Sequence, residues 1–208
     1  MEKESPQDEK IDPESETPFL KDKREELKNL ALELKAGKVE SKMEKMVKFL
    51  RMIELSSTIK ILKSDYIPEE IIPHVYIGTV GSATNLKQLE KKKISHIVCC
   101  AAVVKSFFPD KFKYLNLDIL DSDKADIKQH FEKSNEFIDE AIKNNGNVLV
   151  HCHAGMSRSS TILIAYLIKS QKMKYDEALK LLKSKREKVN PNSGFAEQLK
   201  EYEKEIMK

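Results

Sequence analysis

The fold of this chain is decided by one stretch, residues 148–160, which reads Val148-Leu149-Val150-His151-Cys152-His153-Ala154-Gly155-Met156-Ser157-Arg158-Ser159-Ser160. The apolar residues indicate a buried strand, a short loop follows Cys152, and a helix begins near Ser159. Phosphate binds well at a helix N-terminus, because the first backbone N–H groups lack partners and the helix dipole is positive there. The stretch therefore predicts a strand–loop–helix unit that holds an anion.

The residue types within this loop fit the same anion. Gly155 lets the backbone curl toward it, and the positive end of the helix favours the thiolate form of Cys152. Arg158 is one of only four arginines among 37 basic residues, and its planar fork can bind two oxygens of a phosphoryl group. The alternative interpretation, a structural cysteine beside a solvated arginine, leaves this combination unexplained.

Strands and helices alternate on both sides of the stretch. The pattern indicates four strands, at 75–78, 94–101, 112–117 and 147–150, and five helices, at 82–92, 126–144, 159–171, 175–185 and 193–206. Ser82 and Asp126 are the expected caps of the first two helices. Such alternation predicts an α/β fold with a central, mainly parallel sheet flanked by helices.

The first 65 residues differ from the rest in composition and in the spacing of their apolar residues. Residues 1–20 hold three prolines and seven acidic residues against two lysines, which predicts a disordered acidic segment. Residues 21–65 predict a helical, basic and amphipathic extension with a break near Gly37. The folded domain is expected at 66–208.

Composition excludes several classes of protein. The longest apolar runs are far shorter than the ~20 residues of a membrane-spanning helix, and the first ten residues lack the apolar region of a secretory signal. A net charge of +3 is too small to indicate nucleic-acid binding. Three cysteines form no disulfide framework, so we expect a reducing compartment, cytoplasmic or nuclear.

At residues 151–159 the pattern His-Cys-x5-Arg-Ser resembles the signature of cysteine-dependent phosphatases. Its variant, Ala-Gly-x-Ser-Arg-Ser, is most similar to the dual-specificity protein phosphatases. The resemblance extends from about residue 67 to 206 and includes Val75-Tyr76-Ile77-Gly78, Ala165-Tyr166-Leu167 and Pro191-Asn192-x-Gly194-Phe195-x-x-Gln198-Leu199. It implies a small, atypical member whose catalytic domain, with a protein tyrosine phosphatase-like fold, occupies 66–208.

The resemblance also implies a phosphocysteine mechanism. Cys152 would attack phosphorus, while the loop would bind the phosphate through His153, Ala154, Gly155, Met156, Ser157 and Arg158. The family supplies an aspartate as general acid about thirty residues before the cysteine, and Asp121 lies 31 residues before it. Asp118 is the alternative, whereas Asp123 and Asp126 are expected to be loop and cap residues.

Several neighbouring residues acquire roles by the same resemblance. Ser159 would ease the departure of sulfur in the second step, and His151 would orient the loop and favour the thiolate from behind. Cys99 and Cys100 end a strand, either as core residues or, for Cys100, as a second thiol that captures oxidised Cys152. Asn192 matches the family, although it could equally be a turn residue. Neither a metal nor a cofactor is implied.

The expected function is hydrolysis of phosphotyrosine and phosphoserine or phosphothreonine in proteins. The alternatives are the same chemistry on a phosphoinositide or an RNA 5′-phosphate, which a loop without lysine disfavours, and a non-catalytic phosphate-binding module. Phosphoproteins are the expected partners. The helices of residues 21–62 could pack on the catalytic domain through their apolar face. Alternatively, residues 38–63 could contact a membrane surface peripherally or a calmodulin-like partner.

Overall fold

The computed structural model describes residues 17–37, 41–102, 104 and 106–208, which form two compact units divided between Ser64 and Asp65. The first unit contains two helices, α1 (Pro18–Lys35) and α2 (Lys42–Ser64). Helix α1 begins three residues before the expected boundary, because Thr17 caps it and proline is favoured at the first helical position. The rest of the segment expected to be disordered lies outside the described residues.

The two helices of the first unit pack side by side and are joined by ion pairs. Arg51 of α2 binds Glu26 of α1 at 2.7 Å, and Lys48 binds Glu33 at 2.8 Å. Leu55 of α2 is buried at 1% exposure. No helix within the described residues is long and apolar enough to cross a membrane.

The second unit is built on a single sheet, in which the described residues form five strands in the order β1-β2-β5-β3-β4. Their bounds are β1 Glu69–Ile72, β2 Val75–Gly78, β3 Ile94–Cys99, β4 Lys113–Asn116 and β5 Asn147–His151. Strand β1 is antiparallel to β2, and the remaining neighbours are parallel. The expected mainly parallel sheet is confirmed.

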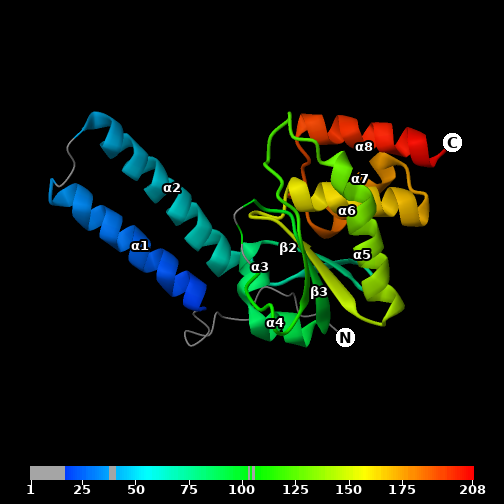
Figure 1. The fold of residues 1–208 in the computed structure, drawn as a ribbon, viewed down its shortest axis with the longest axis horizontal. Helices are drawn as coiled ribbons and strands as arrows, with labels where there is room; N and C mark the ends of the chain where they lie inside the picture. The colour runs from blue at the N-terminus through cyan, green and yellow to red at the C-terminus, as the bar shows by residue number, and fades with distance from the viewer. Residues whose placement is uncertain (1–16, 38–40, 103, 105) are drawn as a thin grey trace, which may run out of the picture. The chain divides into compact units, whose positions relative to one another are not determined.

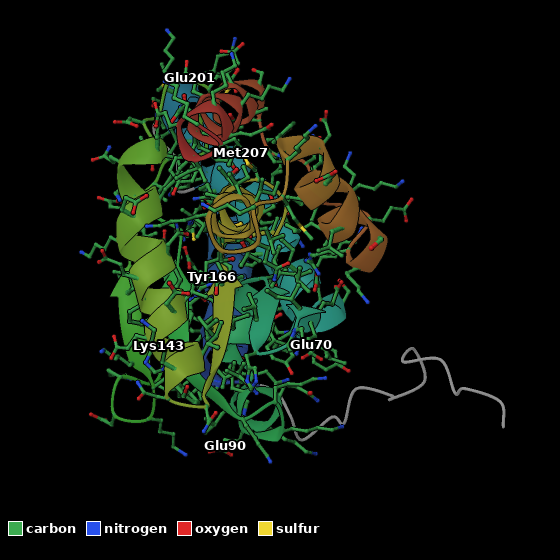
Figure 2. All side chains as sticks on the ribbon, turned by 90° about the vertical axis from the view of Figure 1, so that its right-hand side faces the viewer. Glu70, Glu90, Lys143, Tyr166, Glu201 and Met207 are labelled. Atoms are coloured by element: carbon green, nitrogen blue, oxygen red, sulfur yellow. The ribbon has the colours of Figure 1, made fainter. Side chains whose placement is uncertain are left out.

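Helices cover both faces of this sheet (Figure 1). The larger core lies against α5 (Phe131–Lys143), α6 (Arg158–Gln171), α7 (Tyr175–Lys185) and α8 (Ser193–Ile206), and a smaller core lies against α3 (Val80–Thr84) and α4 (Leu86–Lys91). Side chains alternate accordingly: Val148 and Val150 enter the larger core and Leu149 the smaller one. Charged side chains such as Glu90 and Lys143 lie at the periphery (Figure 2).

Three sequence-based expectations about the elements are wrong. The helix expected at 82–92 is two helices, because Thr79 caps α3 and Asn85 ends it and caps α4. The helix expected from Asp126 begins as a 3-10 turn, Lys128–His130, and only then continues as α5. Strand β1 was not expected, since its four residues stand between two prolines and gain their partners only from β2.

Candidate active site

The phosphate loop, residues 152–157, connects the central strand β5 to the N-terminus of α6. Cys152 is 1% exposed and lies at the bottom of the loop. Its Sγ accepts a hydrogen bond from the backbone N–H of Gly155 at 3.2 Å and lies 3.3 Å from Ser159 Oγ. One backbone donor and one hydroxyl that can donate therefore lie within hydrogen-bond distance of the sulfur.

The tight curl of the loop requires glycine at one position. Gly155 has φ +64°, in the left-handed region that side chains rarely adopt. A Cβ there would also lie 2.7 Å from the carbonyl oxygen of Gly78 and from Nη2 of Arg186. The loop approaches α3 as well, since Val80 N–H donates to the carbonyl of His153 at 3.2 Å.

The other expected phosphate-binding residues differ in how far they are buried. His153 and Ala154 are half-buried and Met156 is exposed, so these residues form the rim of the loop. Ser157 is buried at the base of α6. The backbone of the loop thus runs between the buried Cys152 and solvent, where a phosphoryl group could enter.

Arg158, the first residue of α6, has a buried donor without a hydrogen-bond acceptor. Its Nη1 donates to the carbonyl of Ile119 at 3.2 Å, but its Nε has no hydrogen-bond partner among the described residues. Nε lies 3.4 Å from Asp121 Oδ2, close enough for charge attraction but not aligned for a hydrogen bond. An unsatisfied buried N–H is costly, so this nitrogen is a donor available to an acceptor such as a phosphoryl oxygen.

Asp121 approaches the phosphate loop from the segment after β4. Its Oδ1 accepts hydrogen bonds from Ser157 Oγ at 2.7 Å and from Asn192 Nδ2 at 3.0 Å. Its Oδ2 faces Arg158 Nε. This carboxylate is therefore held against the phosphate loop by Ser157 and Asn192 and faces Arg158.

The three other acidic residues of this segment have different surroundings. Asp118 is exposed, and its electrostatic neighbour is His130. Asp126 Oδ1 accepts the N–H of Gln129 at 3.3 Å, which is a turn cap. The backbone of Asp123 packs against Gly194. Of the four, Asp121 is the one whose carboxylate contacts the phosphate loop.

His151 supports the loop without contributing a charge. It is fully buried, and burial lowers its pKa to about 4, so the imidazole is neutral near pH 7. Its Nδ1 lies 3.4 Å from the carbonyl oxygen of Cys152. The expected orienting role fits this contact, whereas electrostatic stabilisation of the thiolate by His151 does not fit a neutral ring.

Two further thiols lie near the nucleophile. Cys99 and Cys100 are both buried and free, and burial raises the pKa of each thiol. Cys100 shares the larger core with Cys152, and its backbone N–H donates to the carbonyl of His151 at 2.7 Å. The thiol of Cys99 points toward the carbonyls of Ala101 and Val104.

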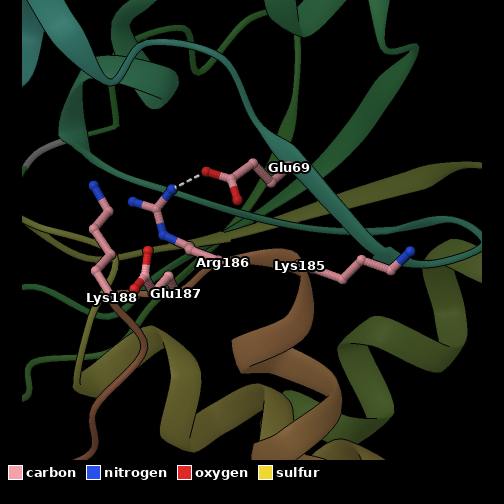
Figure 3. Close-up of a pocket in the computed structure, with 5 residues that line it drawn as sticks. All are labelled: Glu69, Lys185, Arg186, Glu187 and Lys188. Atoms are coloured by element: carbon pink, nitrogen blue, oxygen red, sulfur yellow. Dashed lines mark hydrogen bonds and ion pairs between the residues drawn. The ribbon is translucent and has the colours of Figure 1, made fainter. Parts of the chain in front are cut away.

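A buried arginine supports the phosphate loop from its outer side. Arg186, at the C-terminal end of α7, donates from Nε to the carbonyl of Gly155 at 2.9 Å and from Nη2 to that of Ala154 at 3.2 Å. Its guanidinium is balanced by Asp65 at 2.7 Å. It also forms an ion pair with Glu69, which Figure 3 shows. One side chain thus fixes two consecutive loop carbonyls.

An open cavity of about 500 Å³ lies beside this arginine and is lined by Glu69, Lys185, Arg186, Glu187 and Lys188 (Figure 3). No cysteine, serine or threonine lines the cavity, and its charges are mixed. We therefore assign the chemistry to the phosphate loop and not to this cavity.

Sequence reasoning missed three of these contacts. It assigned Ser157 only to phosphate binding and did not consider Arg186. It left open whether Asn192 matches a functional residue of the family or is only a turn residue. One signal was available, since Arg186 is among the four arginines whose scarcity made Arg158 conspicuous.

A nucleophilic cysteine at a strand–loop–helix junction, with an arginine donor and an opposing carboxylate, defines a cysteine-dependent phosphatase domain. Residues 75–205 match the family model described as "Dual specificity phosphatase, catalytic domain". The chain therefore belongs to the dual-specificity phosphatase family, as its motifs predicted.

Similar proteins differ in how much of their length this chain spans. Dual specificity protein phosphatase 1B of Arabidopsis thaliana is 38% identical over 79% of this chain and 98% of that protein. MAP kinase phosphatase with leucine-rich repeats protein 3 of Dictyostelium discoideum is 45% identical over 67% of this chain but only 16% of that protein. The crystal structure of human tyrosine phosphatase-like serine/threonine/tyrosine-interacting protein superposes with a TM-score of 0.67 at 37% identity, covering 69% of this chain and 99% of that one.

Proposed function

We propose that this protein hydrolyses phosphate monoesters of tyrosine, serine and threonine side chains in proteins. The observation that supports it best is the unsatisfied Nε of Arg158, which lies 3.4 Å from Asp121 Oδ2 at the end of the loop that begins with Cys152. These are the electrophile-binding, nucleophilic and acidic groups that phosphoryl transfer to cysteine requires.

In the first step, Cys152 Sγ attacks phosphorus in line as the bond to the leaving oxygen breaks. Arg158 and the backbone N–H groups of the phosphate loop stabilise the equatorial oxygens. Asp121 donates a proton to the leaving oxygen, because an alkoxide of serine or threonine leaves poorly without one. The products of this step are the free hydroxyl side chain and phosphocysteine.

In the second step, water attacks the phosphocysteine and Asp121, now a carboxylate, takes its proton. The S–P bond breaks and inorganic phosphate forms. Ser159 Oγ, 3.3 Å from Sγ, and the N–H of Gly155 receive the thiolate. These two donors support the sulfur as leaving group.

Activity on phosphotyrosine as well as phosphoserine and phosphothreonine is supported by the short length of the segment that carries Asp121. Only about ten residues separate Leu117 from Ile127, and no insertion deepens the approach to Cys152. A shallow approach admits the shorter phosphothreonine as well as phosphotyrosine.

The test uses the full chain with an aryl phosphate and with phosphotyrosine and phosphothreonine peptides, in the presence of a metal chelator. Cys152→Ser should abolish phosphate release, and Asp121→Asn should lower turnover about 10²–10⁴-fold. A folded wild-type chain that binds phosphopeptides without releasing phosphate would instead identify a non-catalytic binding module.

We also infer a contact function for α2. The side chains of Met43, Met46, Val47, Phe49, Leu50 and Ile53 are each more than half exposed. The unit of α1 and α2 alone therefore leaves an apolar face uncovered, and Lys42 and Lys45 lie near its beginning. Such a face suits an anionic membrane surface or an acidic, calmodulin-like protein.

Vesicle flotation with and without anionic lipid, and calmodulin affinity capture, separate these two partners. Met46→Glu should abolish whichever contact exists, and an unaffected chain would contradict the inference. We infer a cytoplasmic or nuclear location, which three free, buried cysteines support.

A further inference from the structure

The segment that carries Asp121 is exposed and polar, yet it is fastened at several points. Residues 120–124 are all exposed, and a segment of this kind is ordinarily among the more mobile parts of a fold. Its contacts come chiefly from the first two turns of α8, whose residues stand about seventy positions further along the chain. We call residues 118–128 the acid segment.

Three residues at the start of α8, namely its N-cap Asn192, Gly194 and Gln198, contact the acid segment. Asn192, the N-cap residue of α8, donates to Asp121. Gly194 packs against the backbone of Asp123 so closely that a Cβ could not be accommodated. These contacts fix the middle of the segment.

Gln198 fixes its end. Its Oε1 accepts the N–H groups of Ile127 and Lys128, both at 3.0 Å, and its Nε2 donates to the carbonyl of Ala125 at 2.9 Å. All three contacts are to backbone groups, so they depend on the path of the segment and not on its side chains.

The orientation of the Asn192 amide follows from its partners. Its Oδ1 accepts the N–H of Phe195 at 2.9 Å, as an N-cap oxygen does. The group facing Asp121 must then be the NH₂, which can only donate. The backbone N–H of Asn192 also donates to Ser157 Oγ at 3.3 Å, so that this hydroxyl turns its own proton toward Asp121.

These donors leave the two oxygens of Asp121 unequal. Oδ1 accepts two hydrogen bonds, from Ser157 and Asn192, whereas Oδ2 accepts none: Arg158 Nε lies 3.4 Å away but is not aligned to donate to it. A proton on Oδ1 would collide with two donors. Oδ2 is therefore the oxygen that can carry the transferable proton.

We propose that Asn192 is a positioning residue for the general acid: from the N-terminus of α8 it fixes the carboxyl group of Asp121 so that Oδ2 carries the proton given to the leaving oxygen. The proposal rests on the role of Asp121 in the proposed function. It predicts an acid that is already in place before substrate binds, held by α8 and not by closure of a loop.

The test compares two leaving groups in four variants of the full chain. Asn192→Ser keeps an oxygen that can cap α8 but is too short to reach Asp121, so it separates the two roles of the side chain. Asn190→Ser is the matched control, because it makes the same change two residues earlier, where the side chain is exposed. The remaining variants are Asp121→Asn and the Asp121→Asn/Asn192→Ser double variant.

With phenyl phosphate, whose leaving group needs the proton, Asn192→Ser should lower kcat/KM by between about ten- and a hundredfold, the range for losing a hydrogen bond to a charged group. With 4-nitrophenyl phosphate the loss should be much smaller. Inhibition by inorganic phosphate, which depends on Arg158 and the loop, should be unchanged. In the Asp121→Asn background the same substitution should add no further loss.

Equal losses on both substrates, or a further loss in the Asp121→Asn background, would show that Asn192 acts only on the structure of α8 and would overturn the proposal. Unchanged kcat/KM for Asn192→Ser would overturn it as well. If Asp121→Asn itself keeps full activity on phenyl phosphate, the acid assignment of the proposed function fails, which is a distinct result.

Discussion

Gly194→Ala is a substitution for which helix propensity and tertiary packing predict opposite outcomes. Gly194 lies in the first turn of α8, and alanine is favoured over glycine within a helix by about 1 kcal/mol. In the folded chain, however, a Cβ at this position would overlap the carbonyl oxygen of Asp123 and lie 2.7 Å from its carbonyl carbon and 2.8 Å from its Cα. The obstacle is backbone, which cannot rotate away as a side chain can.

The size of the effect follows from these distances. Carbon atoms pack at about 3.5–4.0 Å, so the backbone of Asp123 must withdraw by roughly 1 Å. Overpacking of this kind costs about 1–3 kcal/mol, which exceeds the gain in propensity. Because Asp121 is two residues away, its carboxylate should move as well, and a 1 Å displacement of a catalytic group costs about 10²-fold in rate.

The assay is kcat/KM for phenyl and 4-nitrophenyl phosphate, together with thermal unfolding. We expect a Tm lower by a few degrees and a loss of activity that is larger for phenyl phosphate. Ser193→Ala, at the neighbouring exposed position, is the control and should change neither value. A Gly194→Ala chain with a raised Tm and wild-type activity would refute the close packing of α8 on the acid segment.

Three further predictions concern the groups around the phosphate loop. His151 has a folded-state pKa of about 4 against 6.5 unfolded, so the unfolded chain binds more protons between these values and stability falls as the pH drops through this window. Between pH 6.5 and 5.0, urea unfolding should show the wild type losing about 1.6 kcal/mol more than His151→Gln, and parallel curves would contradict this. Arg186→Met should lower the free energy of unfolding by about 3 kcal/mol, at the low end for a broken buried ion pair, because Lys188 remains beside Asp65. A loss below about 1 kcal/mol in denaturant titration would show that the arginine does not stabilise the fold. If Cys100 captures oxidised Cys152, mild peroxide should inactivate the enzyme reversibly, and Cys100→Ser should make the loss of activity irreversible. If mass spectrometry finds no peptide that links Cys100 to Cys152, Cys100 is a core residue only.

The sequence by itself determined the strand–loop–helix unit at residues 148–160 and the sheet around it. These features are encoded locally, because a buried strand, a loop glycine and an apolar, largely buried helix each leave a pattern within one short segment. The spacing of Cys152 and Arg158 likewise lies within a single loop. Asp121 could be selected over Asp118 only with the help of the resemblance.

Only the tertiary structure decided which distant side chains support these groups. Asn192 meets Asp121 across 71 residues and Arg186 meets Asp65 across 121. Periodicity tells which face of a helix is buried but not which residue of another element it touches. A helix cap such as Asn192 and an arginine such as Arg186 therefore look the same in sequence whether or not they contact the active site. The contacts of Asn192, Gly194 and Gln198 with the acid segment form because folding brings the start of α8 against that segment. No local sequence pattern specifies such a contact.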